Sequence, residues 1–217
     1  MCFRLLLVVG LLFAVVRVLP HAGPRESRPV KTAVQDPETG HTYQLVWAHG
    51  VNWHDARERA KDMQFGGVKG HLATISSPEE QTLLEQHLWH RGLGVFFIGA
   101  SDAEEEGVWR WTDGPEAGTI FFAHGHAADG QFADWYPEEP NNLNRQEDGG
   151  ENVAVWNWKG DRTWNDVTAN NRDWVQGFIV EFSPPQSAKP KRPRVTGPRH
   201  TFLIRESSAS AVPATAP

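Results

Sequence analysis

Carboxylate and side-chain amide residues gather in three short motifs between positions 139 and 166. The motifs are Glu139-Pro140-Asn141, Gly150-Glu151-Asn152 and Trp164-Asn165-Asp166. They offer a cation only oxygen ligands, which suits Ca²⁺ with its shell of about 6–8 oxygens, whereas zinc favours the His and Cys that these motifs lack. The residue types therefore predict a calcium site, and its predicted ligands are Glu139, Asn141, Glu151, Asn165 and Asp166.

A Glu-Pro-Asn sequence on its own is typical of a polar turn. The second motif strengthens the metal interpretation. Trp164 can bury its indole as an anchor while Asn165 and Asp166 stay at the surface on a rigid mount. Two such motifs in one chain favour a ligand site over a turn.

Together, Glu139-Pro140-Asn141 and Trp164-Asn165-Asp166 resemble the carbohydrate-recognition domain of C-type lectins, and the resemblance extends over residues 42–182. The resemblance also implies a cis peptide bond before Pro140, since X-Pro bonds adopt cis at little cost. Further matching segments stand in the family's order: Phe97-Ile98-Gly99, the stretch 107–114, Trp135, Glu151-Asn152-Val153 and a closing strand at 177–182.

The resemblance implies a function for these residues. In the family, a bound calcium ion coordinates two vicinal hydroxyl groups of a sugar, and the same carboxylates and amides form hydrogen bonds with those hydroxyls. The order Glu139 then Asn141 goes with mannose-type ligands there, namely mannose, glucose, N-acetylglucosamine or fucose. We therefore expect a secreted, Ca²⁺-dependent lectin whose partners are glycans or glycoconjugates.

One ligand position has two candidates. The family's usual spacing from Glu139 leads to Glu147, but Glu151 runs directly into an apolar strand. We favour Glu151 and treat residues 144–148 as an expansion of the loop, with Glu147 as the alternative.

The resemblance also implies an auxiliary calcium site. Its ligands would be Asp102, Glu106, Asn142, Glu151 and Asn152. The match is incomplete, because family members with this site tend to have Asp where this chain has Asn152, and each lost charge lowers the affinity for a hard divalent ion. The acidic run ending at Glu106 fits a solvated turn equally well.

A transition-metal site is a further alternative in the segment 119–131. His124 and His126 could bind zinc with Asp129, since imidazole and carboxylate suit that ion. Without a third strong ligand nearby, an exposed loop is favoured for this segment.

Two amphipathic helices precede the region that carries the motifs. Asn52 offers an N-cap for a helix through Asp62, and Ser77-Pro78-Glu79-Glu80 forms a capping box with proline at the first helical position. From Val95 onward, short apolar runs alternate with turns. Helices followed by many short strands predict an α+β fold, here two helices packed on short antiparallel sheets with a long irregular loop region.

The ends of the chain differ in composition from its middle. Residues 1–22 read as a secretory signal peptide, whose apolar run is too short to span a bilayer comfortably, with an uncleaved anchor as the alternative. Residues 23–41 are expected to form a flexible lead-in, 42–182 the domain, and 183–217 a basic, disordered tail rich in Pro, Ser and Ala. The protein is expected to be extracellular, periplasmic or on the cell surface, without stable membrane insertion.

Charge and cysteine content narrow the function further. The chain carries −6; the tail from Ser183 contributes +5 and the first 22 residues +2, which leaves −13 for residues 23–182. An acidic domain repels nucleic acid, so no nucleic-acid partner is expected. Cys2 is the only cysteine, so the chain cannot form the disulfides usual in secreted C-type lectins. Burial among its ten tryptophans is expected to offset that loss, about 2–5 kcal/mol per bridge.

Two other functional classes are alternatives to the lectin. A lectin-like scaffold could bind a protein or another surface, with calcium only stiffening the loop. A glycoside hydrolase could use Glu138 or Glu139 with Glu147 or Glu151, but calcium would hold these carboxylates ionised, and a general acid needs a raised pKa. We therefore expect no enzymatic activity.

Overall fold

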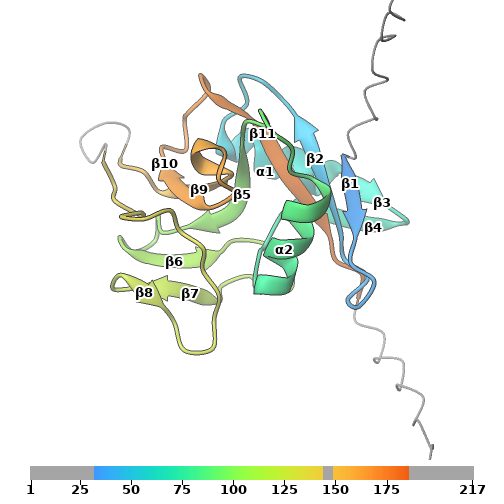
Figure 1. Ribbon diagram of the computed structural model, residues 1–217, viewed down its shortest axis with the longest axis horizontal. Helices are drawn as coiled ribbons and strands as arrows, with labels where there is room; N and C mark the ends of the chain where they lie inside the picture. Colours follow the sequence, from blue (N-terminus) through green and yellow to red (C-terminus); the bar gives the residue numbers. More distant parts are fainter. Residues whose placement is uncertain (1–31, 144–148, 186–217) are drawn as a thin grey trace, which may run out of the picture. The chain divides into compact units, whose positions relative to one another are not determined.

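The computed structural model describes residues 32–143 and 149–185 (Figure 1). The predicted signal peptide, the alternative ligand Glu147 and all but the first residues of the basic tail lie outside this range. The compact unit that contains the secondary structure ends at Ser183. Its elements are β1 (Ala33–Gln35), β2 (Thr42–Trp47), α1 (Trp53–Asp62), β3 (Gln64–Phe65), β4 (Val68–Leu72), α2 (Pro78–His87), β5 (Val95–Ser101), β6 (Val108–Trp111), β7 (Ile120–Ala123), β8 (His126–Ala127), β9 (Val153–Trp156), the 3₁₀-helix η1 (Trp158–Gly160), β10 (Trp164–Val167) and β11 (Val175–Phe182).

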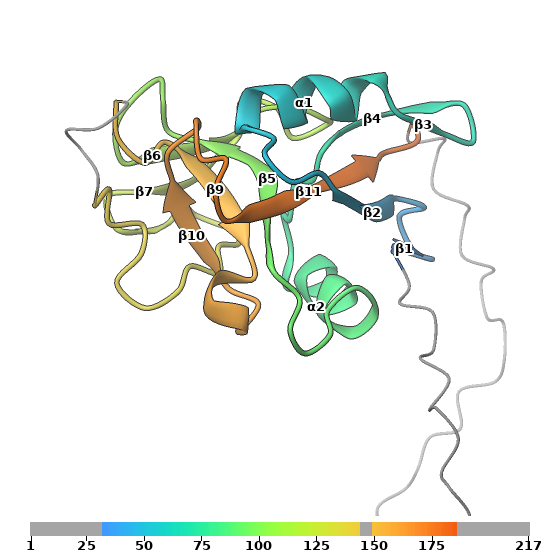
Figure 2. The ribbon, with the colours of Figure 1, turned by 90° about the horizontal axis from the view of Figure 1, so that it is seen from above.

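The strands form one mixed sheet with β11 near its centre. The main order is β1-β2-β11-β5-β6-β7-β8; β9 pairs with β5 and with β10, and β4 pairs with β11 and with β3. Strand β11 runs antiparallel to β2 and β4 but parallel to β5. The sheet is therefore mixed, whereas antiparallel sheets were predicted. Helices α1 and α2 lie on opposite sides of β11 (Figure 2). The α+β class is confirmed.

Both helices begin at the predicted caps. Asn52 Oδ1 accepts a hydrogen bond from the amide of Asp55 at 2.7 Å, which satisfies one of the free donors at the start of α1. In α2, Ser77 Oγ accepts from the amide of Glu80 at 3.2 Å. The Glu80 carboxylate turns to the amide of Ser76, at 2.7 Å, and so does not close the box on the cap residue itself.

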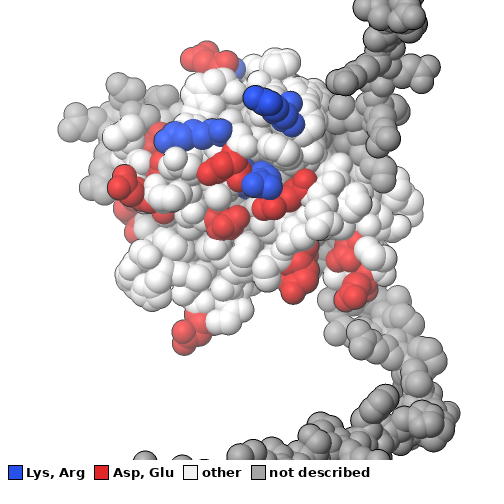
Figure 3. All heavy atoms as spheres, in the orientation of Figure 1, with Lys and Arg blue, Asp and Glu red and all other residues white. Residues whose placement is uncertain are grey.

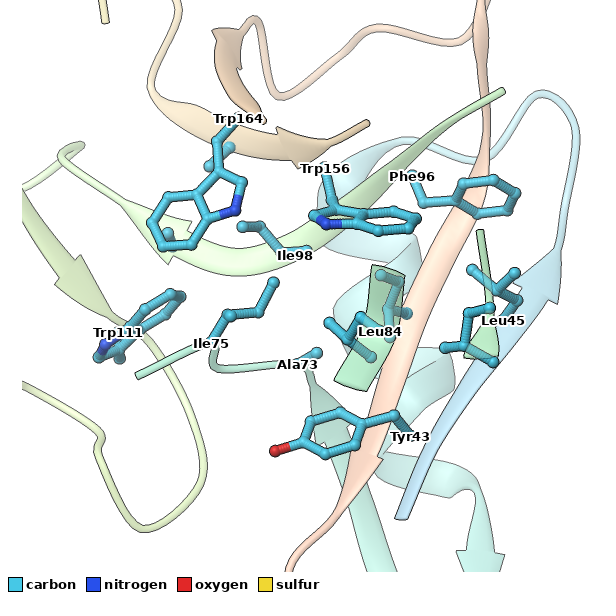
Figure 4. Close-up of a cluster of buried hydrophobic side chains, with 14 of the residues drawn as sticks. Tyr43, Leu45, Ala73, Ile75, Leu84, Phe96, Ile98, Trp111, Trp156 and Trp164 are labelled. Carbon is cyan, nitrogen blue, oxygen red and sulfur yellow. The ribbon is translucent and has the colours of Figure 1, made fainter. Parts of the chain in front are cut away.

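Large aromatic side chains pack with aliphatic ones in the core, as Figure 4 shows for Trp111, Trp156 and Trp164. The Trp111 ring stacks on Phe121 with the centroids 4.3 Å apart and meets Trp164 edge-on at 5.9 Å. Five of the ten tryptophans are buried: Trp53, Trp109, Trp111, Trp156 and Trp164. Each contributes roughly 1.5–3 kcal/mol or more by burial, so they can offset the missing disulfides.

Two segments predicted to be irregular contain strands. Residues 33–35 of the predicted lead-in form β1, which pairs with β2 and packs Val34 against the core. The pairing and the apolar contact of Val34 stabilise this segment, and its composition alone does not indicate either of them. The predicted loop 119–131 contains the β7–β8 hairpin, with His124 at its turn in a left-handed conformation (φ 55°).

The surface agrees with the predicted charge. On the face shown in Figure 3, acidic side chains are more widely spread than basic ones. In the described part of the chain, no helix has the length and apolar character needed to cross a membrane.

Candidate metal and ligand site

Between β8 and β9, the described residues 128–143 and 149–152 form no helix or extended strand, and Trp135 makes an isolated bridge to Trp164 of β10. This segment is fastened to Trp164: the amide of Trp164 donates to Asp134 O at 2.8 Å, and the amide of Tyr136 donates to Trp164 O at 2.8 Å. The Trp164 side chain is fully buried, as predicted for an anchor. These contacts hold the Glu139-Pro140-Asn141 motif against the strand that carries Asn165 and Asp166.

The Glu139–Pro140 bond is cis, at the position where the resemblance predicts it. Glu138 and Asn142, on either side of the motif, both adopt positive φ angles, 74° and 48°. Such backbone conformations are uncommon outside glycine and persist only where the surroundings enforce them. The motif is therefore held in a specific shape by its neighbours.

Asn165 and Asp166 are buried, with 5% and 1% of their surface exposed. The prediction that they stay at the surface is wrong. The Asp166 carboxylate accepts hydrogen bonds from the amides of Asn141, at 3.2 Å, and Asn142, at 2.7 Å. The loop thus folds over β10 and binds the Asp166 carboxylate through its backbone.

Asn142 joins the predicted principal and auxiliary sets. Its side-chain Nδ2 donates to Glu106 at 2.6 Å, and its Oδ1 accepts from the amide of Glu151 at 2.9 Å. Gly150 makes this approach possible, since its φ is +99° and a Cβ there would lie 2.7 Å from Asn142 Oδ1. Glu151 in turn accepts from the amide of Leu143 at 2.8 Å. Glu151, the favoured candidate, therefore lies in the cluster.

Three buried oxygen atoms here have no hydrogen-bond partner among the described residues. They are Glu139 Oε2, Asn165 Oδ1 and Asp102 Oδ1. A buried acceptor without a donor is costly, and most buried polar atoms in folded proteins are paired. Because these orphaned atoms belong to predicted calcium ligands, they fit a role as ligands to a hard cation.

The electrostatics agree with this fit. Burial and the nearby Asp166 carboxylate raise the pKa of Glu139 to about 7, with a smaller contribution from Glu151. Burial, with added repulsion from Glu106 and Asp166, raises the pKa of Asp102 to about 6. Burial also raises the pKa of Asp166, and this effect outweighs the hydrogen bonds from the two loop amides, which lower it. A divalent cation would relieve this repulsion among carboxylates.

The cluster has limits. Asn141, a predicted ligand, is exposed, unlike Asn165 and Asp166. The Nδ2 of Asn152 donates to Gly149 O at 2.9 Å, and its backbone carbonyl accepts from the amide of Asp102 at 3.3 Å, which ties this residue to the auxiliary set. Over residues 32–143 and 149–185, no three or more His, Cys, Asp or Glu side chains are arranged to hold a metal. The three carboxylates of the predicted set, Glu139, Glu151 and Asp166, are therefore not arranged to hold an ion by themselves, and the set depends on its asparagine oxygens as well.

One charged neighbour of the cluster was not predicted. The positive charge of Lys159, in η1, acts to lower the pKa of Glu139, whereas the neighbouring carboxylates raise it. No motif in the sequence indicates this contact, because it depends on a left-handed turn at residues 157–159 that brings η1 back towards the loop.

Comparison with protein families identifies one match. The model described as "Lectin C-type domain" matches residues 50–175. Halomucin of Haloquadratum walsbyi is 37% identical over 143 residues, which cover 66% of this chain and 1% of halomucin. The human low affinity immunoglobulin epsilon Fc receptor is 28% identical over 137 residues, 62% of this chain and 34% of the receptor. The chain therefore corresponds to a small part of each relative.

Solved structures share the fold. The carbohydrate-recognition domain of the human scavenger receptor C-type lectin aligns with a TM-score of 0.52 at 21% identity, covering 70% of this chain and 97% of that domain. The lectin CEL-I of Cucumaria echinata aligns with a TM-score of 0.51 at 19% identity, covering 69% and 94%. At these identities the likeness establishes the fold.

Proposed function

The chain belongs to the C-type lectin domain family, and from this premise we propose that it is a calcium-dependent, carbohydrate-binding protein with mannose-type specificity. The observation that carries the proposal is the set of orphaned oxygens on Glu139 and Asn165 beside the Asp166 carboxylate. Uncompensated acceptors crowded with like charges are expected where a bound cation completes the structure.

We assign the predicted residues to two tasks. Glu139, Glu151, Asn165 and Asp166 would hold Ca²⁺ through their oxygens, and Asn141 would close the shell from the exposed side of the loop. When bound, the ion offers coordination positions to two vicinal sugar hydroxyls. The carboxylates can accept hydrogen bonds from these hydroxyls, and the amide of the exposed Asn141 can donate one.

The backbone supports these roles by fixing the side chains in advance. Asp166 is oriented by two loop amides, and Asn165 Nδ2 donates to Asp166 O at 2.6 Å, which leaves Asn165 Oδ1 available as a ligand. The auxiliary residues Asp102, Glu106 and Asn142 are proposed to brace the loop, with or without a second ion. We also propose that the protein acts outside the cytoplasm, as its relatives' domain type and the predicted signal peptide favour.

A lectin-like scaffold that binds a protein or surface is the second candidate. Leu143 favours it, because this apolar side chain is 77% exposed beside the cluster. An exposed leucine contributes little to sugar binding but suits a protein interface. Competition by simple sugars distinguishes the two functions.

The test combines calcium titration by calorimetry with retention on immobilised mannose, with and without chelator. Glu139→Ala and Asn165→Ala are expected to abolish retention without unfolding the protein. Glu38→Ala, at an exposed glutamate in the β1–β2 turn, is the matched control and should retain the wild-type behaviour. Calcium binding without chelator-sensitive retention would favour the scaffold, and no calcium binding would refute the proposed site.

A further inference from the structure

An exposed aromatic surface lies next to the candidate site. Trp158 and Trp174 form a ring pair with centroids 5.4 Å apart, and Trp174 is 41% exposed. The ammonium group of Lys159 lies 4.4 Å from the ring centre of Tyr136 and 5.7 Å from that of Trp158. We call Tyr136, Trp158 and Trp174 the aromatic shelf.

The shelf is continuous with the calcium cluster. The amide of Glu139 donates to Tyr136 O at 2.9 Å, so the shelf's first ring stands three residues before a predicted ligand on the same turn. Lys159 bridges the two regions, since its charge acts on Glu139 while its ammonium group sits over the Tyr136 ring. The η1 turn that carries Trp158 and Lys159 lies next to β9 and β10 (Figure 1).

The ammonium group of Lys159 contacts aromatic rings but forms no ion pair among the described residues. The side chain of Lys159 is exposed, and none of the carboxylates in the described residues lies within ion-pair distance of it. A cation bound by Glu139 would neutralise that carboxylate, which the charge of Lys159 affects. In the loaded site, the ammonium group would therefore be available to an anionic group of a ligand.

We propose that the aromatic shelf and Lys159 form a second sugar subsite, which receives the neighbouring residue of an acidic oligosaccharide anchored at the calcium site. The inference rests on the proposed lectin function. The apolar face of a pyranose ring would pack on Trp174 and Trp158, because indole offers a large, rigid apolar surface. A carboxylate or sulfate on that ring would pair with Lys159.

The subsite would raise the affinity of a shallow calcium site for its glycan. A monosaccharide held by two hydroxyls has few atoms in contact with the protein and should bind weakly. A second ring on the shelf adds contact area, and the ion pair at an exposed lysine adds up to about fivefold in affinity. The preferred ligand class is thus a glycan with a uronic acid or sulfated residue next to a mannose-type residue.

The test compares three sugars on the full, calcium-saturated chain by calorimetry: methyl α-mannoside, mannobiose and a glucuronosyl-mannose disaccharide. We expect the dissociation constant to fall in that order, with the acidic disaccharide bound about fivefold more tightly than mannobiose. Tryptophan fluorescence should change with the disaccharides and not with the monosaccharide. In 1 M salt only the preference for the acidic disaccharide should disappear, because screening shortens the Debye length to about 3 Å.

Two variants separate the contributions. Trp174→Ala should remove the gain of both disaccharides over methyl α-mannoside, and Lys159→Gln should remove only the preference for the acid. The controls are Phe65→Ala, an aromatic residue that is 51% exposed on β3, and Lys69→Gln, an exposed lysine on β4; both should behave as wild type.

Equal dissociation constants for the three sugars, or disaccharide gains that survive Trp174→Ala, would overturn the subsite while leaving the lectin function intact. Failure to bind even methyl α-mannoside would overturn the proposed function and the subsite with it.

Discussion

Two groups of buried carboxylates in this protein have opposite surroundings. Glu181, fully buried on β11, has donors at both oxygens: His41 Nδ1 at 2.8 Å and Ser183 Oγ at 2.6 Å from Oε1, and the amide and hydroxyl of Thr74 at 2.9 Å from Oε2. In the proposed calcium site and its auxiliary set, Glu139 and Asp102 each keep one buried oxygen without a donor among the described residues.

The pKa values show the same contrast. Burial works to raise the pKa of Glu181, but the hydrogen bonds from His41, Ser183 and Thr74, with the charge of His71, outweigh it and the net pKa is lowered. The pKa values of Glu139 and Asp102 are raised. The difference between the two regions is therefore one of hydrogen-bond donors, not of burial. It supports a structural role for Glu181 and the proposed ligand role for the cluster.

The largest effect is expected from Glu181→Gln. The change removes the partner of His41 and puts an amide group where donors already point, so the free energy of unfolding should fall by about 3 kcal/mol, with or without calcium. Chemical denaturation in calcium and in chelator measures this. A loss seen only in chelator would contradict the assignment of Glu181 to the fold.

Calcium should stabilise the wild-type protein by about 2.7 kcal/mol when its concentration is 100 times the dissociation constant. Asp166→Asn should abolish that stabilisation, because it removes a central carboxylate of the cluster. Thermal melts at increasing calcium concentration give the result. Glu38→Ala is the control, and a calcium-dependent shift that persists in Asp166→Asn would place the site elsewhere.

The His41–Glu181 ion pair should make stability depend on pH. The hydrogen bond to Glu181 raises the pKa of His41 above 6.5. The contribution of His41 to folding stability is therefore complete below pH 6.5 and is lost as pH rises through the raised pKa. Because the pKa of Glu181 is lowered, the contribution of Glu181 to folding stability is complete above pH 4.5 and is lost as pH falls through the lowered pKa.

His41→Gln should therefore destabilise the protein most between pH 4.5 and 6.5, by about 1–2 kcal/mol. The difference in unfolding free energy between variant and wild type, measured from pH 3 to 9, should narrow on both sides of that window. A difference that stays constant with pH would show that His41 acts by packing alone.

The smallest effect has the opposite sign. Asp102→Asn removes one of the repelling charges in the cluster, so the calcium-free protein should gain about 0.5–1 kcal/mol of stability. The same exchange of carboxylate for amide thus destabilises at Glu181 and stabilises at Asp102. Denaturation in chelator tests this, and destabilisation by Asp102→Asn would remove the distinction between the two regions.

Local signals predicted a good part of the fold. The caps at Asn52 and Ser77 begin the two helices because a side-chain oxygen there satisfies a free amide a few residues on, which depends only on neighbouring residues. The burial of Trp164 follows from the size of its side chain. Strand β1 was missed because it is ordered by pairing with β2, a contact that its own composition does not encode.

The chemistry of the site was determined by the sequence, because residue types alone restrict the cluster to oxygen ligands and the chain to a disulfide-free fold. Which atoms are free to act was decided by the tertiary structure. Folding the loop over β10 directed loop amides to the buried Asp166, paired the Asn152 amide with Gly149 O and brought the charge of Lys159 near Glu139. Hydrogen-bond partners and charge neighbours are set by residues distant in the chain, so no motif could have specified them.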